Sequence, residues 1–264
     1  MKTIAMIPTY NEVLNMRNTI ESVLNCGVPG IEVLIVDDMS PDGSYKIVEE
    51  ISKTDNRVHL LLRKEKRGRG YAGIDGFKKA LEMGADFIVE MDADGSHNPK
   101  YIPKFLEMID NYSAAQIDNY SAAQTDNYGA AQTNNYGAAQ TNDYGAIIGS
   151  RFIKGGSDEE RGFLRKTISA MSRIYLSFII GTKVKDPTSG FRLFKRETLE
   201  TFIDKLKARD PFIVTEVLFY LQKNKIKVAE CPIEFLQRKA GQSKLRPFTL
   251  IKYLFKVLLL RINF

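Results

Sequence analysis

The sequence predicts an α/β fold in which a mostly parallel sheet is flanked by helices. Short apolar segments with strand character recur about every 25–30 residues in the first part of the chain. Segments with the apolar spacing of helices separate them, and this alternation is typical of a parallel sheet covered on its faces. The chain has 264 residues, of which 44% are hydrophobic, so it can bury a substantial core.

The individual elements follow from these patterns in chain order. Strands are predicted at residues 3–7, 32–36, 58–62 and 87–91, with helices between them at residues 13–24, 44–53 and 71–83. Further along, the patterns predict a strand at 146–148, helices at 168–180 and 212–222, and two short edge strands at 228–230 and 233–236, one on each side of Pro232.

A tandem repeat interrupts the pattern from Ile109 onward. Five octads follow one another, IDNYSAAQ, IDNYSAAQ, TDNYGAAQ, TNNYGAAQ and TNDYGAII, and the last merges into the strand at 146–148. A tyrosine every eight residues matches neither helical nor strand periodicity, and the polar composition offers little surface to bury. We interpret residues 109–144 as a flexible insertion in a surface connection. A tyrosine-rich binding ladder is the alternative.

Composition excludes several classes of protein. Cys26 and Cys231 are too few for a disulfide framework or a zinc site, so a reducing, cytosolic setting is expected. No apolar run reaches about 18 residues, so no transmembrane helix is expected. The net charge is +6, but the residues from 235 onward carry seven basic groups and no acid, which leaves −1 on the rest. The uneven charge argues against a nucleic-acid-binding face.

The C-terminal segment has the character of an interfacial helix. Residues 248–264 are strongly apolar, with Lys252, Lys256 and Arg261 at helical spacing. The segment is too short and too charged to span a bilayer, but its apolar face suits the membrane interface and its basic residues suit anionic headgroups. We therefore divide the chain into a main domain, residues 1–236, and a basic amphipathic tail, residues 237–264. Packing of this helix on the domain or on a partner subunit is the alternative.

Two acids, Asp92 and Asp94, directly follow the predicted strand at 87–91. In an open α/β sheet, ligands bind beyond the carboxyl ends of the strands. Two carboxylates one residue apart repel each other, and a divalent cation shared with a diphosphate would explain the pair, since hard cations prefer oxygen ligands. The alternative is an acidic turn that caps the next helix.

Polar residues also follow the first two predicted strands. Pro8, Tyr10 and Glu12 close the first strand, and Asp37 closes the second. Because these loops are neighbours at one edge of the sheet, their side chains are candidates to hold a base and ribose. Capping of the following helices is the competing explanation.

The segment Gly68-Arg69-Gly70-Tyr71-Ala72-Gly73 reads G-x-G-x-x-G, the dinucleotide-binding fingerprint. However, five charged residues separate it from the strand at 58–62, whereas the phosphate turn needs the first glycine close to the strand end. We expect an anion site at the helix N-terminus and do not favour a nicotinamide cofactor.

Cationic side chains in the second half of the chain are candidates for a phosphate site. Arginine is suited to bidentate phosphate recognition. The candidates are Arg151, Arg165 with Ser169 four residues later on the same helix face, and Arg238. A solvated basic surface is the alternative for each arginine taken alone.

Together the motifs resemble a known family. The order PTYNE, VDD, the glycine-rich helix, MDADGSH, GSRF, R-x-x-x-S, DPTSGFR and GQSKL is similar to that of the family 2 glycosyltransferases of GT-A fold that use polyprenyl phosphate, of which dolichyl-phosphate mannosyltransferase is the type. The resemblance covers residues 3–108 and 145–250. It implies a Rossmann-like GT-A sheet and an inverting transfer of mannose from GDP-mannose to dolichyl phosphate. A sister enzyme that uses UDP-glucose would share nearly every motif.

The resemblance also implies roles for the candidate residues. The residues implied to bind the nucleotide are Pro8, Tyr10, Glu12, Asp37 and Asp92, and those implied to bind Mg²⁺ or Mn²⁺ are Asp92 and Asp94. The residues implied to bind the lipid phosphate are Arg151, Arg165, Ser169 and Arg238. The residues implied to be catalytic are Asp94, Arg151 and Arg165. A peripheral location on the cytoplasmic face of a membrane follows, with room for a membrane-anchoring partner subunit. One departure is Ser96, where some relatives carry an amide that contacts the metal.

Overall fold

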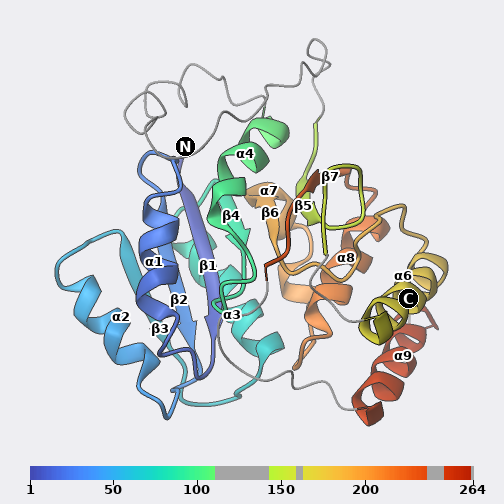
Figure 1. The fold of residues 1–264 in the computed structure, drawn as a ribbon, viewed down its shortest axis with the longest axis horizontal. Coiled ribbons are helices and arrows are strands. Elements are labelled where there is room, and N and C mark those ends of the chain that lie inside the picture. Colours follow the sequence, from blue (N-terminus) through green and yellow to red (C-terminus); the bar gives the residue numbers. More distant parts are fainter. Residues whose placement is uncertain (111–142, 159–162, 237–246, 263–264) are drawn as a thin grey trace.

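In the computed structural model the protein is described for residues 1–110, 143–158, 163–236 and 247–262. A seven-stranded sheet forms its centre (Figure 1), with the strand order β3-β2-β1-β4-β6-β5-β7. The strands are β1 Thr3–Thr9, β2 Glu32–Asp37, β3 Val58–Leu62, β4 Phe87–Glu90, β5 Ala146–Ser150, β6 Arg192–Lys195 and β7 Val228–Pro232. All neighbouring strands pair in parallel except β6, which is antiparallel to both β4 and β5.

Helices cover both faces of the sheet. They are α1 Met16–Leu24, α2 Ser44–Ser52, α3 Arg69–Glu82, α4 Ile102–Asp110, α6 Phe163–Ile180, α7 Arg196–Glu200, α8 Ile213–Lys223 and α9 Pro247–Ile262, with short 3-10 turns at Pro99–Tyr101 and Ile203–Lys205. Alternate residues of β4 face different cores: Ile88 packs with α3 and α8, and Val89 packs with α1 and α4. The side-chain alternation of the strands therefore divides the interior into two apolar layers.

The predicted α/β class and most of its elements are confirmed. The first four strands and the three helices between them lie within a few residues of their predicted bounds. The strand β6 was not predicted, because it is only four residues long and follows a turn-rich segment. The predicted division of the last strand into 228–230 and 233–236 is wrong, since β7 runs without a break to Pro232. A proline is tolerated there because β7 lies at the edge of the sheet, where among the described strands it pairs with β5 only.

The glycines of α3 allow this helix to lie very close to its neighbours. A Cβ added at Gly70 would come within 2.6 Å of the carbonyl carbon of Ala208, and one at Gly73 within 2.7 Å of Ile213. At Gly76 the added carbon would meet Met6 on β1 at 2.7 Å. Protein atoms therefore fill the space beside these glycines, and the G-x-G-x-x-G pattern reflects helix packing. At the start of α3, where an anion site was predicted, the Gly68 amide donates to a carboxylate of the protein, Asp38 Oδ2, at 2.6 Å, so that amide is occupied and the anion site stays a prediction.

None of the helices that the structure describes has the length and apolar content needed to cross a bilayer. The helices α6 and α9 lie side by side at one end of the sheet (Figure 1), where the Tyr175 hydroxyl donates to the Leu254 carbonyl at 2.8 Å.

The packing of α3 makes Gly70 a sensitive position. We expect Gly70→Ala to destabilise the fold by about 1–3 kcal/mol, because the new methyl group meets backbone atoms of residue 208 that have no rotamer to change. Thermal unfolding should show a lower midpoint for this variant. The control is Lys79→Ala on the exposed side of the same helix, where we expect little change. An unchanged midpoint for Gly70→Ala would contradict the packing account.

Candidate active site

The carboxyl ends of β1, β2 and β4 bring the predicted nucleotide and metal residues to one edge of the sheet. Thr9 of β1 pairs in register with Asp37 of β2, and Met6 of β1 pairs with Glu90 of β4. The loops that follow these strands therefore emerge next to one another. This edge is where ligands bind in open α/β sheets.

The loop after β1 is fastened to the loop after β2 by its backbone. The amide of Asn11, a residue with φ of 61°, donates to Ser40 Oγ at 3.0 Å, and the Glu12 amide donates to Ser44 Oγ at 2.9 Å. Tyr10 remains 41% exposed at the tip, and the Glu12 carboxylate accepts a hydrogen bond from Asn15. The predicted residues of this loop thus lie at the edge, where an incoming ligand can reach Tyr10.

Asp37 and Asp38 serve first to hold the loops. Asp37 is fully buried, and its two oxygens accept hydrogen bonds from Thr9 Oγ1 at 2.9 Å and from the amide and hydroxyl of Ser40 at 2.7 and 2.8 Å. Asp38 pairs with the buried guanidinium of Arg63. Of the two acids, the predicted Asp37 is therefore already coordinated by neighbouring hydroxyl and amide groups.

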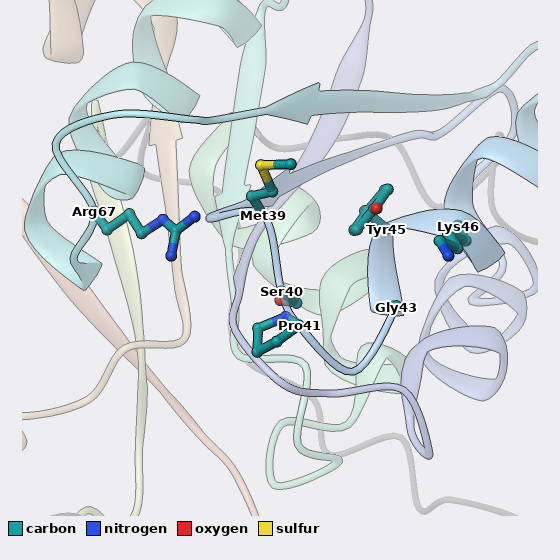
Figure 2. Close-up of a pocket in the computed structure, with 7 residues that line it drawn as sticks. All are labelled: Met39, Ser40, Pro41, Gly43, Tyr45, Lys46 and Arg67. Atoms are coloured by element: carbon teal, nitrogen blue, oxygen red, sulfur yellow. The ribbon is translucent and has the colours of Figure 1, made fainter.

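A cavity of about 260 Å³ opens beside this loop (Figure 2). It is lined by Met39, Ser40, Pro41, Gly43, Tyr45, Lys46 and Arg67. Figure 2 shows Arg67 on one side of Met39, with Tyr45 and Lys46 on the other. None of these residues was predicted, because an aromatic ring and two cations from separate segments form no local motif.

The acid pair lies just beyond the end of β4. Asp94 is only 6% exposed, and its Oδ1 accepts hydrogen bonds from the Ser96 hydroxyl at 2.6 Å and the Ser96 amide at 3.1 Å. The Asp92 side chain is 37% exposed. Ser96, noted above as a departure from some relatives, thus orients Asp94. Asp92 presents its carboxylate at the edge.

His97 lies behind the acid pair as a neutral ring. Its Nδ1 accepts a hydrogen bond from the Asp92 amide at 3.0 Å, and the ring stacks on Phe191 with a centroid distance of 5.1 Å. Burial, helped by the charges of Arg151 and Arg69, lowers the pKa of His97 in spite of the two nearby carboxylates. The ring therefore supports the Asp92 backbone as a hydrogen-bond acceptor. His97 belongs to the MDADGSH motif, but no role was predicted for it.

Asp92 and Asp94 could bind a divalent cation if a bound ligand supplied further coordinating oxygens. Among the described residues, no group of three or more His, Cys, Asp or Glu side chains is placed to hold a metal ion. Asp92 and Asp94 supply oxygen donors, which Mg²⁺ and Mn²⁺ prefer, and such ions commonly complete their coordination with substrate phosphates and water. The residues present therefore fit a cation that arrives with a diphosphate.

Arg151, at the end of β5, is held by a carboxylate from the loop before β6. Its Nε donates to Asp186 Oδ2 at 2.7 Å and its Nη2 donates to Asp186 Oδ1 at 2.8 Å, and both residues are buried. The guanidinium also lies over the rings of Phe152 and Phe235, at 5.0 and 5.1 Å from their centroids. Burial alone would raise the pKa of Asp186, but the hydrogen bonds and charge of Arg151 outweigh burial and hold that pKa below its ordinary value.

The other predicted phosphate residues fall at the limits of the description. Arg165 and Ser169 belong to α6, but their side chains lie outside the described part of the structure. Arg238 lies outside the described residues altogether. The structure therefore brings Asp92, Asp94 and Arg151 near His97, and the roles of all six residues stay predictions.

A mostly parallel sheet with the acid pair at its carboxyl edge is an arrangement suited to a nucleotide-dependent enzyme, and comparison with known proteins identifies the family. The family model described as glycosyl transferase family 2 matches residues 4–203. The chain therefore belongs to glycosyl transferase family 2, and it is a glycosyltransferase.

Three curated relatives are similar over most of the chain. An undecaprenyl-phosphate mannosyltransferase from Micrococcus luteus is 32% identical over 93% of this chain and 88% of its own length. A polyprenol monophosphomannose synthase from Mycolicibacterium smegmatis is 30% identical over 97% and 85%. A dolichol-phosphate mannosyltransferase from Pyrococcus furiosus is 33% identical over 96% of this chain and 62% of the relative.

Solved structures confirm the GT-A fold. Glucosyl-3-phosphoglycerate synthase from Mycobacterium tuberculosis, in complex with phosphoglyceric acid, matches with a TM-score of 0.60 and 16% identity, covering all of this chain and 80% of that one. The same enzyme in complex with Mn²⁺, uridine diphosphate and glucosyl-3-phosphoglycerate matches with a TM-score of 0.60 and 15% identity, covering 100% and 79%.

The Arg151–Asp186 pair should be essential to the fold at this edge. We expect Asp186→Asn to lower the free energy of unfolding by about 3–5 kcal/mol, since it leaves a buried guanidinium without its counter-charge. Because the folded-state pKa of Asp186 is lowered, its contribution is full above the ordinary carboxyl pKa of about 3.9 and is lost as the pH falls through the lower folded value. Urea unfolding between neutral and acidic pH checks both statements.

The control is Asp204→Asn, whose carboxylate pairs with Lys78 at the surface and is 85% exposed. Surface pairs contribute about 1 kcal/mol or less, so this variant should unfold like the parent. Equal stability of Asp186→Asn and the control would contradict the structural role of the buried pair.

Proposed function

We propose that this chain transfers mannose from GDP-mannose to dolichyl phosphate or another polyprenyl phosphate, with formation of a β-linked mannosyl phosphate lipid. The observation that carries the proposal is the acid pair Asp92 and Asp94 at the carboxyl end of β4, in a chain whose relatives are named as polyprenyl-phosphate mannosyltransferases. The pair supplies the oxygen donors that a cation and a nucleotide diphosphate require.

The donor would lie along the carboxyl edge of β1, β2 and β4. Tyr10, at the exposed tip of its loop, is the proposed stacking partner of the base, with Pro8 and Glu12 in the same loop and Asp37 at the end of β2. The cavity beside Met39 widens this edge and adds an aromatic ring and two cations. These residues support binding of a nucleoside diphosphate sugar, and they leave the base undecided between guanine and uracil.

The acceptor is proposed to enter beside β5. Arg151, Arg165, Ser169 and Arg238 are the proposed phosphate ligands. Arg151 already gives two donors to Asp186, so its contribution to the acceptor is mainly the electrostatic field of a rigidly held cation. The side chains of the other three supply the direct hydrogen bonds in this proposal.

The chemistry follows from the charges of the two substrates. An acceptor phosphate oxygen is anionic at neutral pH, so no side chain needs to remove a proton from it. His97, buried and with Nδ1 occupied by the Asp92 amide, is accordingly not needed as a base. A bound divalent cation would neutralise the departing diphosphate. The chain holds the donor carbon in line with the acceptor oxygen, which inverts the anomeric configuration.

The main competing function is transfer of a different sugar. One relative is a UDP-N-acetylglucosamine–dolichyl-phosphate N-acetylglucosaminyltransferase from Methanococcus voltae, 27% identical over 90% of this chain and 87% of its own length. A UDP-glucose-dependent transferase would use the same acid pair. An NAD-dependent oxidoreductase has lost its support, because the glycines of α3 pack against protein atoms.

We also propose that the enzyme is peripheral and docks on the cytoplasmic face of a membrane through α6 and α9. Both helices present large apolar side chains to solvent, and they are Met171, Ile174 and Phe178 on α6 and Phe255, Leu258, Leu259 and Ile262 on α9. Lys252, Lys256 and Arg261 are exposed on α9 as well. An apolar face with basic residues matches an anionic lipid surface. A membrane-anchoring partner subunit is the second candidate occupant.

Sugar transfer tests the proposed reaction. We expect label from GDP-mannose to enter a polyprenyl-phosphate extract in the presence of Mn²⁺, to be lost with EDTA, and to fall about 100-fold or more in Asp94→Ala. The control is Asp143→Asn, an 84% exposed acid that pairs with Lys195. A product with the α configuration would overturn direct displacement. Transfer from UDP-glucose alone would keep the site and replace the donor, whereas no transfer from either donor would overturn the function.

Vesicle flotation tests the membrane surface. Phe178 and Phe255 are 83% and 61% exposed, and burial of each ring contributes roughly 1.5 kcal/mol or more. We expect the double variant Phe178→Ser/Phe255→Ser to bind mixed phosphatidylcholine and phosphatidylglycerol vesicles at least about tenfold more weakly. Leu14→Ser, which removes a side chain 78% exposed in the turn between β1 and α1, should bind like the parent. Equal binding of all three proteins would favour a protein partner for this face.

A further inference from the structure

Arg69 connects the interior of the sheet with the acid pair. It lies between Gly68 and Gly70 at the start of α3, and its side chain reaches β4. Its Nη2 donates to Glu90 Oε1 at 2.8 Å and lies 3.7 Å from Asp92 Oδ1. One guanidinium group therefore contacts a carboxylate inside the sheet and a carboxylate of the proposed cation site.

The two acids stand on the same face of β4 and its extension, since they are two residues apart. Glu90 is buried, with a side chain only 1% exposed, whereas the Asp92 side chain is 37% exposed. The Arg69 side chain, 20% exposed, lies between these environments. Glu90 thus holds the Arg69 side chain from the buried side, and Asp92 contacts it from the solvent-exposed side.

The Arg69–Glu90 pair is poorly designed for stability alone. Glu90 Oε2 and Arg69 Nη1 are both buried, and neither has a hydrogen-bond partner among the residues that the structure describes. Buried polar atoms are normally satisfied, and a buried ion pair can often be replaced by apolar residues without loss of stability. A pair kept in spite of these costs suggests a task other than holding the core together.

The positive charge of Arg69 is permanent. Burial alone would lower the pKa of Arg69, but the charges of Glu90 and Asp92 outweigh burial and raise it above its ordinary value. Arginine also offers donors in a rigid planar fork, which lets one side chain meet two carboxylates in fixed directions. Lysine, a single point charge on a flexible stem, has no such fork.

We propose that Arg69 is a positioning residue of the donor site, which holds the Asp92 carboxylate in place for a divalent cation and the donor diphosphate by bracing it against Glu90. The inference rests on the proposed function, since it concerns the same site. Arg69 acts through Asp92, in the way that outer partners of metal ligands commonly fix the orientation of those ligands.

Two variants separate positioning from simple charge balance. Arg69→Lys keeps the charge next to Glu90 and removes the fork. Arg69→Met/Glu90→Gln removes one positive and one negative charge together, so the net charge near Asp92 is conserved and no buried acid is left without a partner. The buried Arg192, whose charge Glu90 also stabilises, keeps the carboxylate of Asp186 nearby in the double variant. The control is Arg209→Gln, an exposed arginine on the same flank whose guanidinium lies 5.9 Å from the ring of Tyr71.

The measurement is the binding of Mn²⁺ in the presence of GDP or UDP, followed by electron paramagnetic resonance of free Mn²⁺ with no acceptor present. Thermal unfolding of each variant checks that it is folded. We expect the double variant to bind Mn²⁺ with the nucleotide about 10-fold or more weakly than the parent, Arg69→Lys to fall between them, and Arg209→Gln to match the parent. In transfer assays the loss should appear in KM for the donor more than in kcat.

The outcomes are distinct. Parental Mn²⁺ binding by a folded double variant would overturn the proposal and leave Arg69 as a structural partner of Glu90, while the proposed function stands. A parent that binds no Mn²⁺ with either nucleotide and transfers no sugar would overturn the proposed function and this inference together. Loss of binding in the folded double variant, with the parent active, supports both.

Discussion

Arginine–carboxylate pairs at the carboxyl edge of the sheet are the interactions on which the site depends. Three of them link segments far apart in the chain, and they are Arg63 with Asp38, Arg69 with Glu90 and Arg151 with Asp186. In each pair the carboxylate is almost completely withdrawn from water. A buried charge is stable only beside its partner, so each pair holds two segments of the chain at a fixed distance. Together these three pairs hold the segments around the acid pair Asp92 and Asp94 in place.

The same pairs show where sequence reasoning succeeds and where it ends. Apolar runs predicted the strands, and the rule that ligands lie beyond strand ends placed Asp92 and Asp94 at the correct edge. Local patterns do not show which of the many arginines pairs with which buried carboxylate. Arg63 was one of five consecutive charged residues, and nothing in that run distinguishes it as the buried one. Burial depends on the whole fold, which a local pattern does not contain.

The segment from Gly68 to Gly73 shows that one pattern can have two physical causes. A phosphate requires glycines so that backbone amides can approach it, and a close helix crossing requires them so that two backbones can touch. Here the second cause applies, because α3 meets the segment before α8 where Gly70 faces Ala208. The informative residue of the motif is Arg69. Its neighbours Gly68 and Gly70 have no side chain, and its own long side chain reaches Glu90 on β4.

The antiparallel strand β6 has a consequence for the long repeat. Because β6 runs against its neighbours, its first residue, Arg192, lies at the edge of the acid pair, and the loop from 186 to 191 enters the site from there. The strand β5 instead begins on the opposite rim, and most of the octads that precede it in the sequence lie outside the described residues. A change in repeat number would therefore alter the length of the chain between α4 and the amino end of β5, whereas the loop from 186 to 191 reaches the acid pair from the other rim of the sheet.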